Sequence, residues 1–253
     1  MAAEKKRLDL LLTESKMVSS RQRARALILA GKVLVNHIPV DKAGALVAKD
    51  AQIEIKGEDH PFVSRGGLKL KIIFDHFKFS VKDLICMDVG ASTGGFTDCL
   101  LQHGAKKVYA VDVGYGQLAW KLRQDPRVIP IERTNIRYLD SGKISDPIDV
   151  ITVDASFISL KLVVPAALKF LRPCGVIIPL IKPQFEVGKG KVGKGGVVKD
   201  PALHQAVISD LIKYFEKLGL QCGPVIPTPI LGPKGNQEFV LLLHYHKNHS
   251  YQQ

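Results

Sequence analysis

A glycine-rich loop near the middle of the chain has the composition of a ligand-binding turn. The segment DVGASTGGF, residues 88–96, follows a short apolar run and precedes residues that favour a helix. Glycine has no Cβ atom, so a backbone that contains it can turn tightly and approach a ligand closely. In open α/β sheets, ligands bind at the carboxyl ends of strands, where this loop would lie. The predicted ligand contacts are Asp88, Gly90, Ser92, Thr93, Gly94, Gly95 and Phe96.

A carboxylate at the end of the next apolar run narrows the class of ligand. Asp112 lies 24 residues after Asp88, in a position suited to binding ribose hydroxyls. The loop has no phosphate-binding lysine, and its spacing departs from G-x-G-x-x-G. These features fit a nucleoside without phosphates, and S-adenosylmethionine is such a molecule. Asn135, after the third run, is a further candidate for contact with the adenine. The alternative is a glycine-rich turn that serves packing only.

Two later apolar runs also end in charged residues. Asp154 ends the run VITVD, and Lys182 ends the run VIIPLIK. Charged residues are poor core material, so both are expected to face the cleft beside the glycine-rich loop. A neutral lysine can accept a proton from a weakly nucleophilic hydroxyl, and a carboxylate can hold that lysine in place. Ordinary ion pairs at strand ends are the alternative interpretation.

The elements that must position these residues alternate along the chain. Apolar runs with the length of strands occur at residues 84–89, 108–113, 128–131, 149–154, 175–181 and 238–245, separated mostly by helical stretches. Strands spaced by helices indicate an α/β domain with a mainly parallel, doubly wound sheet. The last run follows a stretch rich in proline and glycine, residues 223–235, and is therefore expected to be antiparallel.

A smaller α+β unit precedes this domain. Apolar spacing predicts helices at residues 8–14 and 19–30, with Ser19 or Ser20 as an N-cap and Gly31 as a C-cap glycine. Strands are predicted at residues 33–35 and 51–55, with a turn at residues 36–39 after the first of them. We place the linker at about residues 56–63, between a domain of residues 1–60 and a domain of residues 61–253.

The charge of the chain favours a polyanionic partner. Its 36 Lys and Arg residues outnumber its 24 Asp and Glu residues, which gives a net charge of +12. Between Lys16 and Lys49, seven basic residues accompany a single acidic one, Asp41. Arg21, Arg25 and Lys32 are spaced along one face and the end of the second predicted helix, as phosphate contacts require. A charged helix face that is merely solvated is the alternative.

Other classes of protein are disfavoured. The sequence contains no apolar stretch of the ~18 residues that a membrane span needs, and its first residues lack the apolar core of a signal peptide. The four cysteines lie far apart, which suits reduced thiols. His244, His246 and His249 lack a nearby acid or cysteine cluster, so no metal is expected. We expect a cytoplasmic protein with no membrane contact.

The motifs together resemble a known family. The segment 88–96 is similar to the first motif of FtsJ-type ribose methyltransferases, with Thr93 and Phe96 where that group often has Pro and Trp. The segments RALILAGKV, residues 25–33, and Val35-Asn36 resemble the ribosomal-protein S-four-type RNA-binding domain. Their fusion through PFVSRGGLKL, residues 61–70, is similar to the TlyA family, whose members are often called haemolysin A. The resemblance covers residues 5–245.

The resemblance implies a fold, an activity and a set of catalytic residues. It implies a Rossmann-like S-adenosylmethionine-dependent methyltransferase domain behind an RNA-binding domain, which together methylate a ribose 2′-hydroxyl of rRNA. The Lys-Asp-Lys-Glu tetrad of FtsJ-type enzymes falls on Lys69, Asp154, Lys182 and Glu238. The expected partner is structured RNA, either rRNA or a ribosomal subunit, contacted by a monomer. The predicted RNA contacts are Arg21, Arg25, Lys32 and Arg65.

Three alternatives stay open at this point. A noncatalytic RNA-binding or assembly factor would be expected to have lost part of the tetrad or the glycine-rich loop. A membrane-lytic protein would be expected to carry an amphipathic or spanning segment and a secretion signal. Base methylation would be expected to show an Asn/Asp-Pro-Pro-aromatic loop or a nucleophilic cysteine, whereas Asp154-Ala155-Ser156-Phe157 supplies neither. Which nucleotide is modified cannot be derived from the sequence.

Overall fold

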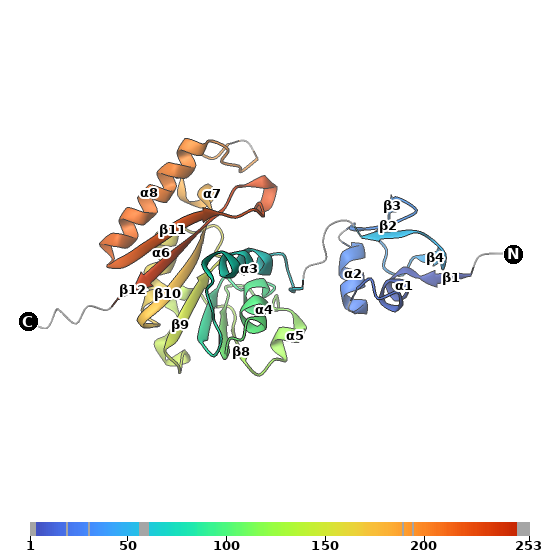
Figure 1. Cartoon of the computed structure of the whole chain (residues 1–253), viewed down its shortest axis with the longest axis horizontal. Coiled ribbons are helices and arrows are strands. Elements are labelled where there is room, and N and C mark those ends of the chain that lie inside the picture. The colour runs from blue at the N-terminus through green and yellow to red at the C-terminus, as the bar shows by residue number, and fades with distance from the viewer. Residues whose placement is uncertain are drawn as a thin grey trace, which may run out of the picture. The chain divides into compact units, whose positions relative to one another are not determined.

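The computed structural model describes residues 4–18, 20–29, 31–55, 61–188, 190–193 and 195–246 (Figure 1). The chain folds as two units, Met1–Pro61 and Phe62–Gln253. Four features of the sequence analysis lie outside the described residues: the alternative cap Ser19, the predicted helix end at residue 30, residues 56–60 of the linker, and His249.

The first unit packs two helices against short strands. Leu8, Leu12, Leu27 and Ile28 form the centre of its core. Ser20 caps the second helix, since its Oγ accepts the backbone N–H of Arg23 at 3.2 Å. The helices are α1 (Leu8–Glu14) and α2 (Arg21–Leu29). The strands are β1 (Lys5–Arg7), β2 (Val33–Val35), β3 (Ile38–Pro39), β4 (Leu46–Ala48) and β5 (Ile53–Ile55).

The predicted turn at residues 36–39 is only partly a turn. Asn36 and His37 have φ of 51° and 66°, the left-handed conformation at both central positions of a two-residue hairpin. This tight turn lets Ile38 pair with Val35, so that β3 joins an antiparallel sheet in the order β3-β2-β5. The pairing of β1 with β4 was not predicted either, because each strand has only three residues.

The second unit is built on a seven-stranded sheet in the order β11-β12-β10-β9-β6-β7-β8. The five strands from β10 to β8 are parallel, and β12 pairs antiparallel with β10. The predicted mainly parallel sheet with an antiparallel last strand is therefore confirmed. The strands are β6 (Ile85–Val89), β7 (Lys107–Val111), β8 (Val128–Ile131), β9 (Ile148–Val153), β10 (Leu171–Ile181), β11 (Leu220–Pro227) and β12 (Phe239–Tyr245).

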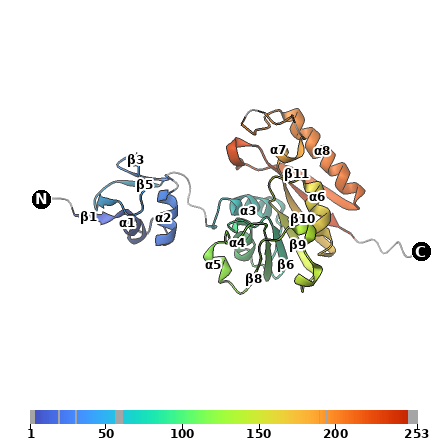
Figure 2. The ribbon, with the colours of Figure 1, turned by 180° about the vertical axis from the view of Figure 1, so that it is seen from behind.

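Helices cover both faces of this sheet, which gives three layers (Figures 1 and 2). Alternate strand residues enter two separate cores: Cys86 packs with α3 and α4, whereas Met87 packs with α6 and α8. The helices are α3 (Gly66–Phe77), α4 (Gly95–Gln102), α5 (Trp120–Arg123), α6 (Leu160–Leu168), α7 (Pro183–Glu186) and α8 (Pro201–Lys217). Short 3-10 turns occur at η1 (Ile136–Tyr138), η2 (Ser141–Lys143) and η3 (Pro233–Gly235).

Strand β11 corrects the prediction for residues 223–235. No strand was predicted there, yet Gly223 and Pro224 lie inside this edge strand. The register of β11 against β12 shifts between Cys222 and Val225, so a bulge accommodates the two residues. An edge strand tolerates this irregularity because only one of its sides must pair.

The strand order reverses between β6 and β9, which are parallel neighbours. Such a reversal opens a crevice at the carboxyl ends of the two strands. Gly90 follows β6 there with φ of +87°, and a Cβ atom on it would lie 2.7 Å from the carbonyl oxygen of Asp154. The position therefore requires glycine, and the loop after β6 runs directly against the end of β9.

Candidate active site

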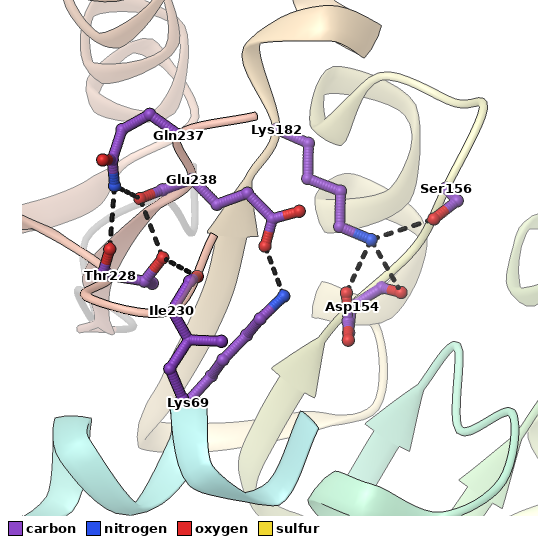
Figure 3. A network of polar contacts seen from close by, with 8 residues as sticks. All are labelled: Lys69, Asp154, Ser156, Lys182, Thr228, Ile230, Gln237 and Glu238. Carbon is purple, nitrogen blue, oxygen red and sulfur yellow. Dashed lines mark hydrogen bonds and ion pairs between the residues drawn. The ribbon is translucent and has the colours of Figure 1, made fainter. Parts of the chain in front are cut away.

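Four charged side chains from four separate elements form two ion pairs at the crevice (Figure 3). Lys69 Nζ lies 2.5 Å from Glu238 Oε2, and Lys182 Nζ lies 2.6 Å from Asp154 Oδ1. Lys69 projects from α3, Asp154 follows β9, Lys182 follows β10 and Glu238 precedes β12. All four line one cavity of about 300 Å³.

The pair of Lys69 and Glu238 is almost completely buried. Their side chains are 7% and 0% exposed. Glu238 Oε1 is buried without a hydrogen-bond partner among the described residues. Gly232 packs against this carboxylate so closely that a Cβ atom on it would lie 2.0 Å from Oε1. Because a buried ion pair is stable only when its geometry is well held, the turn that contains Gly232 fixes Glu238 toward Lys69.

Lys182 is surrounded by three oxygen atoms. Besides its ion pair with Asp154, Nζ donates to Ser156 Oγ at 2.9 Å and to the carbonyl oxygen of Asp154 at 3.4 Å. The side chain of Lys182 is 8% exposed and that of Asp154 is 23% exposed. This pair is therefore more open to the cavity than the pair of Lys69 and Glu238.

A second cavity, of about 550 Å³, adjoins the first. The two cavities share Gly90, Ser92, Asp154 and Ser156. Asp112 lines the second cavity, and its carboxylate accepts the backbone N–H of Ser92 at 2.7 Å and that of Gly114 at 2.6 Å. Each carboxylate oxygen can accept a further hydrogen bond, so Asp112 keeps capacity for hydroxyl donors of a ligand.

Five of the seven predicted residues of the glycine-rich loop line a cavity, and two do not. Ser92 and Gly90 line both cavities, and the first cavity is also lined by Thr93, Gly95 and Phe96. Asn135 lines the second cavity, where its Oδ1 accepts the backbone N–H of Arg137 at 3.1 Å.

Asp88 and Gly94 line neither cavity. A Cβ atom on Gly94 would lie 2.2 Å from the side chain of Leu122, so this glycine permits packing beneath the loop. Asp88 is fully buried and accepts hydrogen bonds from both the backbone and the hydroxyl of Thr97. Burial raises the pKa of Asp88 to about 7. Asp88 thus holds the start of α4 rather than facing a ligand.

Sequence reasoning missed several residues that line the cavities. Ser156 follows Asp154 by two positions and lines both cavities, and Gln117 and Phe157 line the larger one. Phe157 has φ of 62° and is 90% exposed, which is unusual for a large aromatic side chain. Exposure of an aromatic residue cannot be derived from an isolated sequence, although its position beside Asp154 was a usable signal.

The predicted RNA-contacting residues do not share one environment. Arg25 and Lys32 are exposed on the first unit, and Arg65 is exposed at the cavity that contains the two ion pairs. Arg21 is also exposed, but it forms an ion pair with the buried Asp9, with Nε 2.9 Å from Oδ2. Hydrogen bonds from Arg7 and then Arg21 lower the pKa of Asp9 to about 2. Arg21 therefore has a structural partner within its own unit.

Two further observations concern metals and membranes. Within the described ranges, no three His, Cys, Asp or Glu side chains gather as a metal site, and the rings of His244 and His246 stack with centroids 6.4 Å apart. No helix among the described residues is long and apolar enough to cross a membrane.

The sheet order and the crevice define the class of protein. An S-adenosylmethionine-dependent methyltransferase from Mesorhizobium loti shares the fold of the second unit, with a TM-score of 0.53 and 11% identity over 72% of this chain and 100% of that chain. The second unit is a Rossmann-like methyltransferase domain. The FtsJ-like methyltransferase family matches residues 62–245, and the S4 domain matches residues 6–53. The chain belongs to the FtsJ-like methyltransferase family and carries an S4 RNA-binding domain.

Several relatives share both parts. The 16S/23S rRNA (cytidine-2′-O)-methyltransferase TlyA of Mycobacterium tuberculosis is 43% identical over 95% of this chain and 90% of that protein. Hemolysin A of Brachyspira hyodysenteriae is 42% identical over 92% of this chain and 98% of that protein. The solved structure of a candidate hemolysin from Streptococcus thermophilus has a TM-score of 0.76 and 40% identity, and covers 97% of this chain and 90% of that chain.

Proposed function

We propose that this methyltransferase transfers a methyl group from S-adenosylmethionine to a ribose 2′-hydroxyl of rRNA. The observation that carries the proposal is the junction of the two cavities at Asp154. One cavity holds a carboxylate suited to a nucleoside, and the other holds two lysine–carboxylate pairs suited to a hydroxyl. The name of the relative TlyA, which specifies cytidine 2′-O methylation of rRNA, supports the same reaction.

The residues of the second cavity fit S-adenosylmethionine. Asp112 can accept hydrogen bonds from ribose hydroxyls, and the glycine at position 90 lets the backbone approach the ligand. When bound, S-adenosylmethionine supplies a methyl group that is attached to a positively charged sulfur. The sulfur is the leaving group and keeps the electron pair of the broken C–S bond. The chain itself must bring the hydroxyl oxygen in line with that bond.

Lys182 and Lys69 have different tasks in this proposal. The ribose oxygen forms a bond to the methyl carbon and gives up its proton to Lys182 Nζ, which must first have released a proton of its own to solvent. Asp154 Oδ1 lies 2.6 Å from Lys182 Nζ and holds this amine at the junction of the cavities. Lys69, fixed by the buried Glu238, supplies positive charge where the oxygen becomes negative. The proton then leaves Lys182 for solvent before the next reaction.

The cofactor assignment is tested by Asp112→Ala. Charge-assisted hydrogen bonds contribute about 1.5–3 kcal/mol, so the Kd for S-adenosylmethionine should rise about 10- to 100-fold. Isothermal titration calorimetry on the folded variant measures this change, with circular dichroism as the control for folding. An unchanged Kd would remove Asp112 from the cofactor site.

The RNA target is tested by mass mapping of rRNA. Ribosomal RNA from cells with and without the gene is digested, and the fragments are compared for the mass of one methyl group. We expect a fragment that carries a ribose methyl group only when the gene is present. The purified protein should restore that methyl group to rRNA from the deficient cells. No methyl transfer, together with retained RNA binding, would favour a noncatalytic assembly factor.

A further inference from the structure

Ser156 lines three neighbouring cavities of the second unit. It lines the cavity of the two ion pairs, the cavity of Asp112, and a third cavity of about 270 Å³ next to Lys182. Of these three cavities, which the described residues form, Asp154 lines only the first two and Lys182 only the first and third. The Ser156 hydroxyl therefore lies where the spaces for cofactor and hydroxyl meet.

The bonds around Lys182 differ in strength. Nζ donates a hydrogen bond to Ser156 Oγ at 2.9 Å and forms an ion pair with Asp154 Oδ1 at 2.6 Å (Figure 3). The third contact, to the carbonyl oxygen of Asp154, is 3.4 Å long and therefore weak. The hydrogen bond to Ser156 is therefore the short directional contact that orients the amine. A ribose hydroxyl can replace the weak contact without disturbing the two short ones.

The loop that carries Ser156 is held by the carboxylate of Glu186, at the end of α7. Phe157 has φ of 62°, and a bulky residue keeps this conformation only when its surroundings determine it. Glu186 accepts the Ser159 hydroxyl at 2.6 Å and the backbone N–H of Leu160 at 2.8 Å. Glu186 ends α7, which begins directly after Lys182. One carboxylate thus ties the segment after Lys182 to the loop that contains Ser156.

We propose that Ser156 is a positioning residue that aims the Lys182 amine at the ribose hydroxyl, and that Glu186 supports it by fixing its loop. The proposal rests on the proposed function, because it concerns the proton transfer of that reaction. Without Ser156, Lys182 keeps a single strong contact and can rotate about its ion pair with Asp154. The chemical step then slows, while the cavities for cofactor and RNA keep their shape.

The test compares Ser156→Ala, Ser156→Thr and Glu186→Gln in the full-length protein under single-turnover conditions, with saturating S-adenosylmethionine and rRNA from deficient cells. Misplacement of a reacting group by about 1 Å costs on the order of 100-fold in rate, so Ser156→Ala should be about 10- to 100-fold slower. Its Kd values for cofactor and RNA should stay within about twofold. Ser156→Thr retains the hydroxyl and should recover most of the rate.

The double variant Ser156→Ala/Glu186→Gln separates support from an independent role. If Glu186 acts through Ser156, the double variant should be no slower than Ser156→Ala alone. Ser80→Ala is the matched control, because Ser80 is an exposed serine that lines none of the three cavities. A full rate in Ser156→Ala, or a Thr variant as slow as the Ala variant, would overturn the proposal.

A second measurement needs no substrate. Carbon-13 relaxation of the Lys182 Cε group reports how well this side chain is ordered, and Ser156→Ala should lower its order parameter while the Lys69 signal stays unchanged. Unchanged order at Lys182 would overturn the positioning role whatever the RNA experiments give. Failure of the proposed function is recognised separately, since the wild-type protein would then transfer no methyl group.

Discussion

The carboxylate partners of the two lysines, Glu238 and Asp154, differ in the exposed fraction of their side chains. The carboxylate that pairs with Lys69 is fully buried, whereas the one that pairs with Lys182 is about a quarter exposed. A fully buried carboxylate holds its lysine partner in place, because breaking the pair would leave a buried charge without a partner. This difference supports the proposed division of tasks, in which Lys69 supplies a fixed charge and Lys182 meets the hydroxyl.

Removal of the Lys182 side chain should abolish methyl transfer while cofactor affinity changes little. Lys182→Ala loses both the proton acceptor and a charge at the reacting oxygen, and general-base loss alone costs about 10²–10⁴-fold. Lys182→Arg should not restore activity, because a guanidinium stays protonated. Single-turnover rates and calorimetry on both variants measure this. Substantial activity in the Arg variant would limit Lys182 to a fixed positive charge.

Asp88 should make stability depend on pH. Burial raises its pKa from 3.8 to about 7, so between these values the folded state holds a proton that the unfolded state has lost. Stability should therefore fall as pH rises through this window, by about 1.4 kcal/mol per unit. Asp88→Asn cannot ionise and lacks this loss. Urea unfolding of both proteins at pH 5, 6 and 7 measures the difference, and parallel pH profiles would contradict it.

Residue types at strand ends were enough to predict that Asp154 and Lys182 lie together. Parallel strands place their carboxyl ends at one edge, and β9 and β10 are neighbours. The partnership of Lys69 with Glu238 spans 169 positions and followed only from the family resemblance. Ser156 and Asp9 were missed because their importance depends on which side chains fold against them. A single serine or aspartate has no periodicity to detect.

At the scale of elements, the turn before β12 determines the position of Glu238. Gly232→Ala places a methyl group 2.0 Å from Glu238 Oε1, so either the carboxylate or the turn must move. We expect a loss of about 1–3 kcal/mol in the free energy of unfolding and slower methyl transfer. Gly142→Ala is the control, because its Cβ would meet nothing closer than 3.6 Å. Equal stability and rates in both variants would show that the turn yields easily.

Most strands of the large sheet could be predicted from the sequence, whereas short strands and one edge strand were missed. Central parallel strands such as β9 are buried on both faces and read as continuous apolar runs, whereas the edge strand β8 is buried only at its two ends. The missed strands are β1, β3 and β4 of the first unit, which have only two or three residues each, and the edge strand β11. Strand β11 contains Gly223 and Pro224. Their pairing depends on a hairpin turn or a bulge, and composition alone describes both as loops.

For the whole molecule, the two units should divide docking from chemistry. Removal of residues 1–60 should leave a folded domain that binds S-adenosylmethionine but scarcely methylates structured RNA. The first unit contributes exposed basic residues such as Arg25 and Lys32, whose phosphate contacts weaken as salt rises. Circular dichroism, calorimetry and methylation at low and high salt test this. Full activity of the shortened protein at high salt would contradict the division.

The place of β12 in the sheet also has a consequence for the order in which the protein matures during synthesis. This strand is made last of the seven, yet it lies inside the sheet, between β10 and β11. A nascent chain that ends after β11 lacks β12, the strand that pairs with both β10 and β11. It also lacks Glu238, so Lys69 does not yet have its carboxylate partner. Domains fold from the N-terminus as they emerge. The S4 domain is thus synthesised in full long before Glu238 can pair with Lys69, so under the proposed function the unit for RNA docking would form before the catalytic centre.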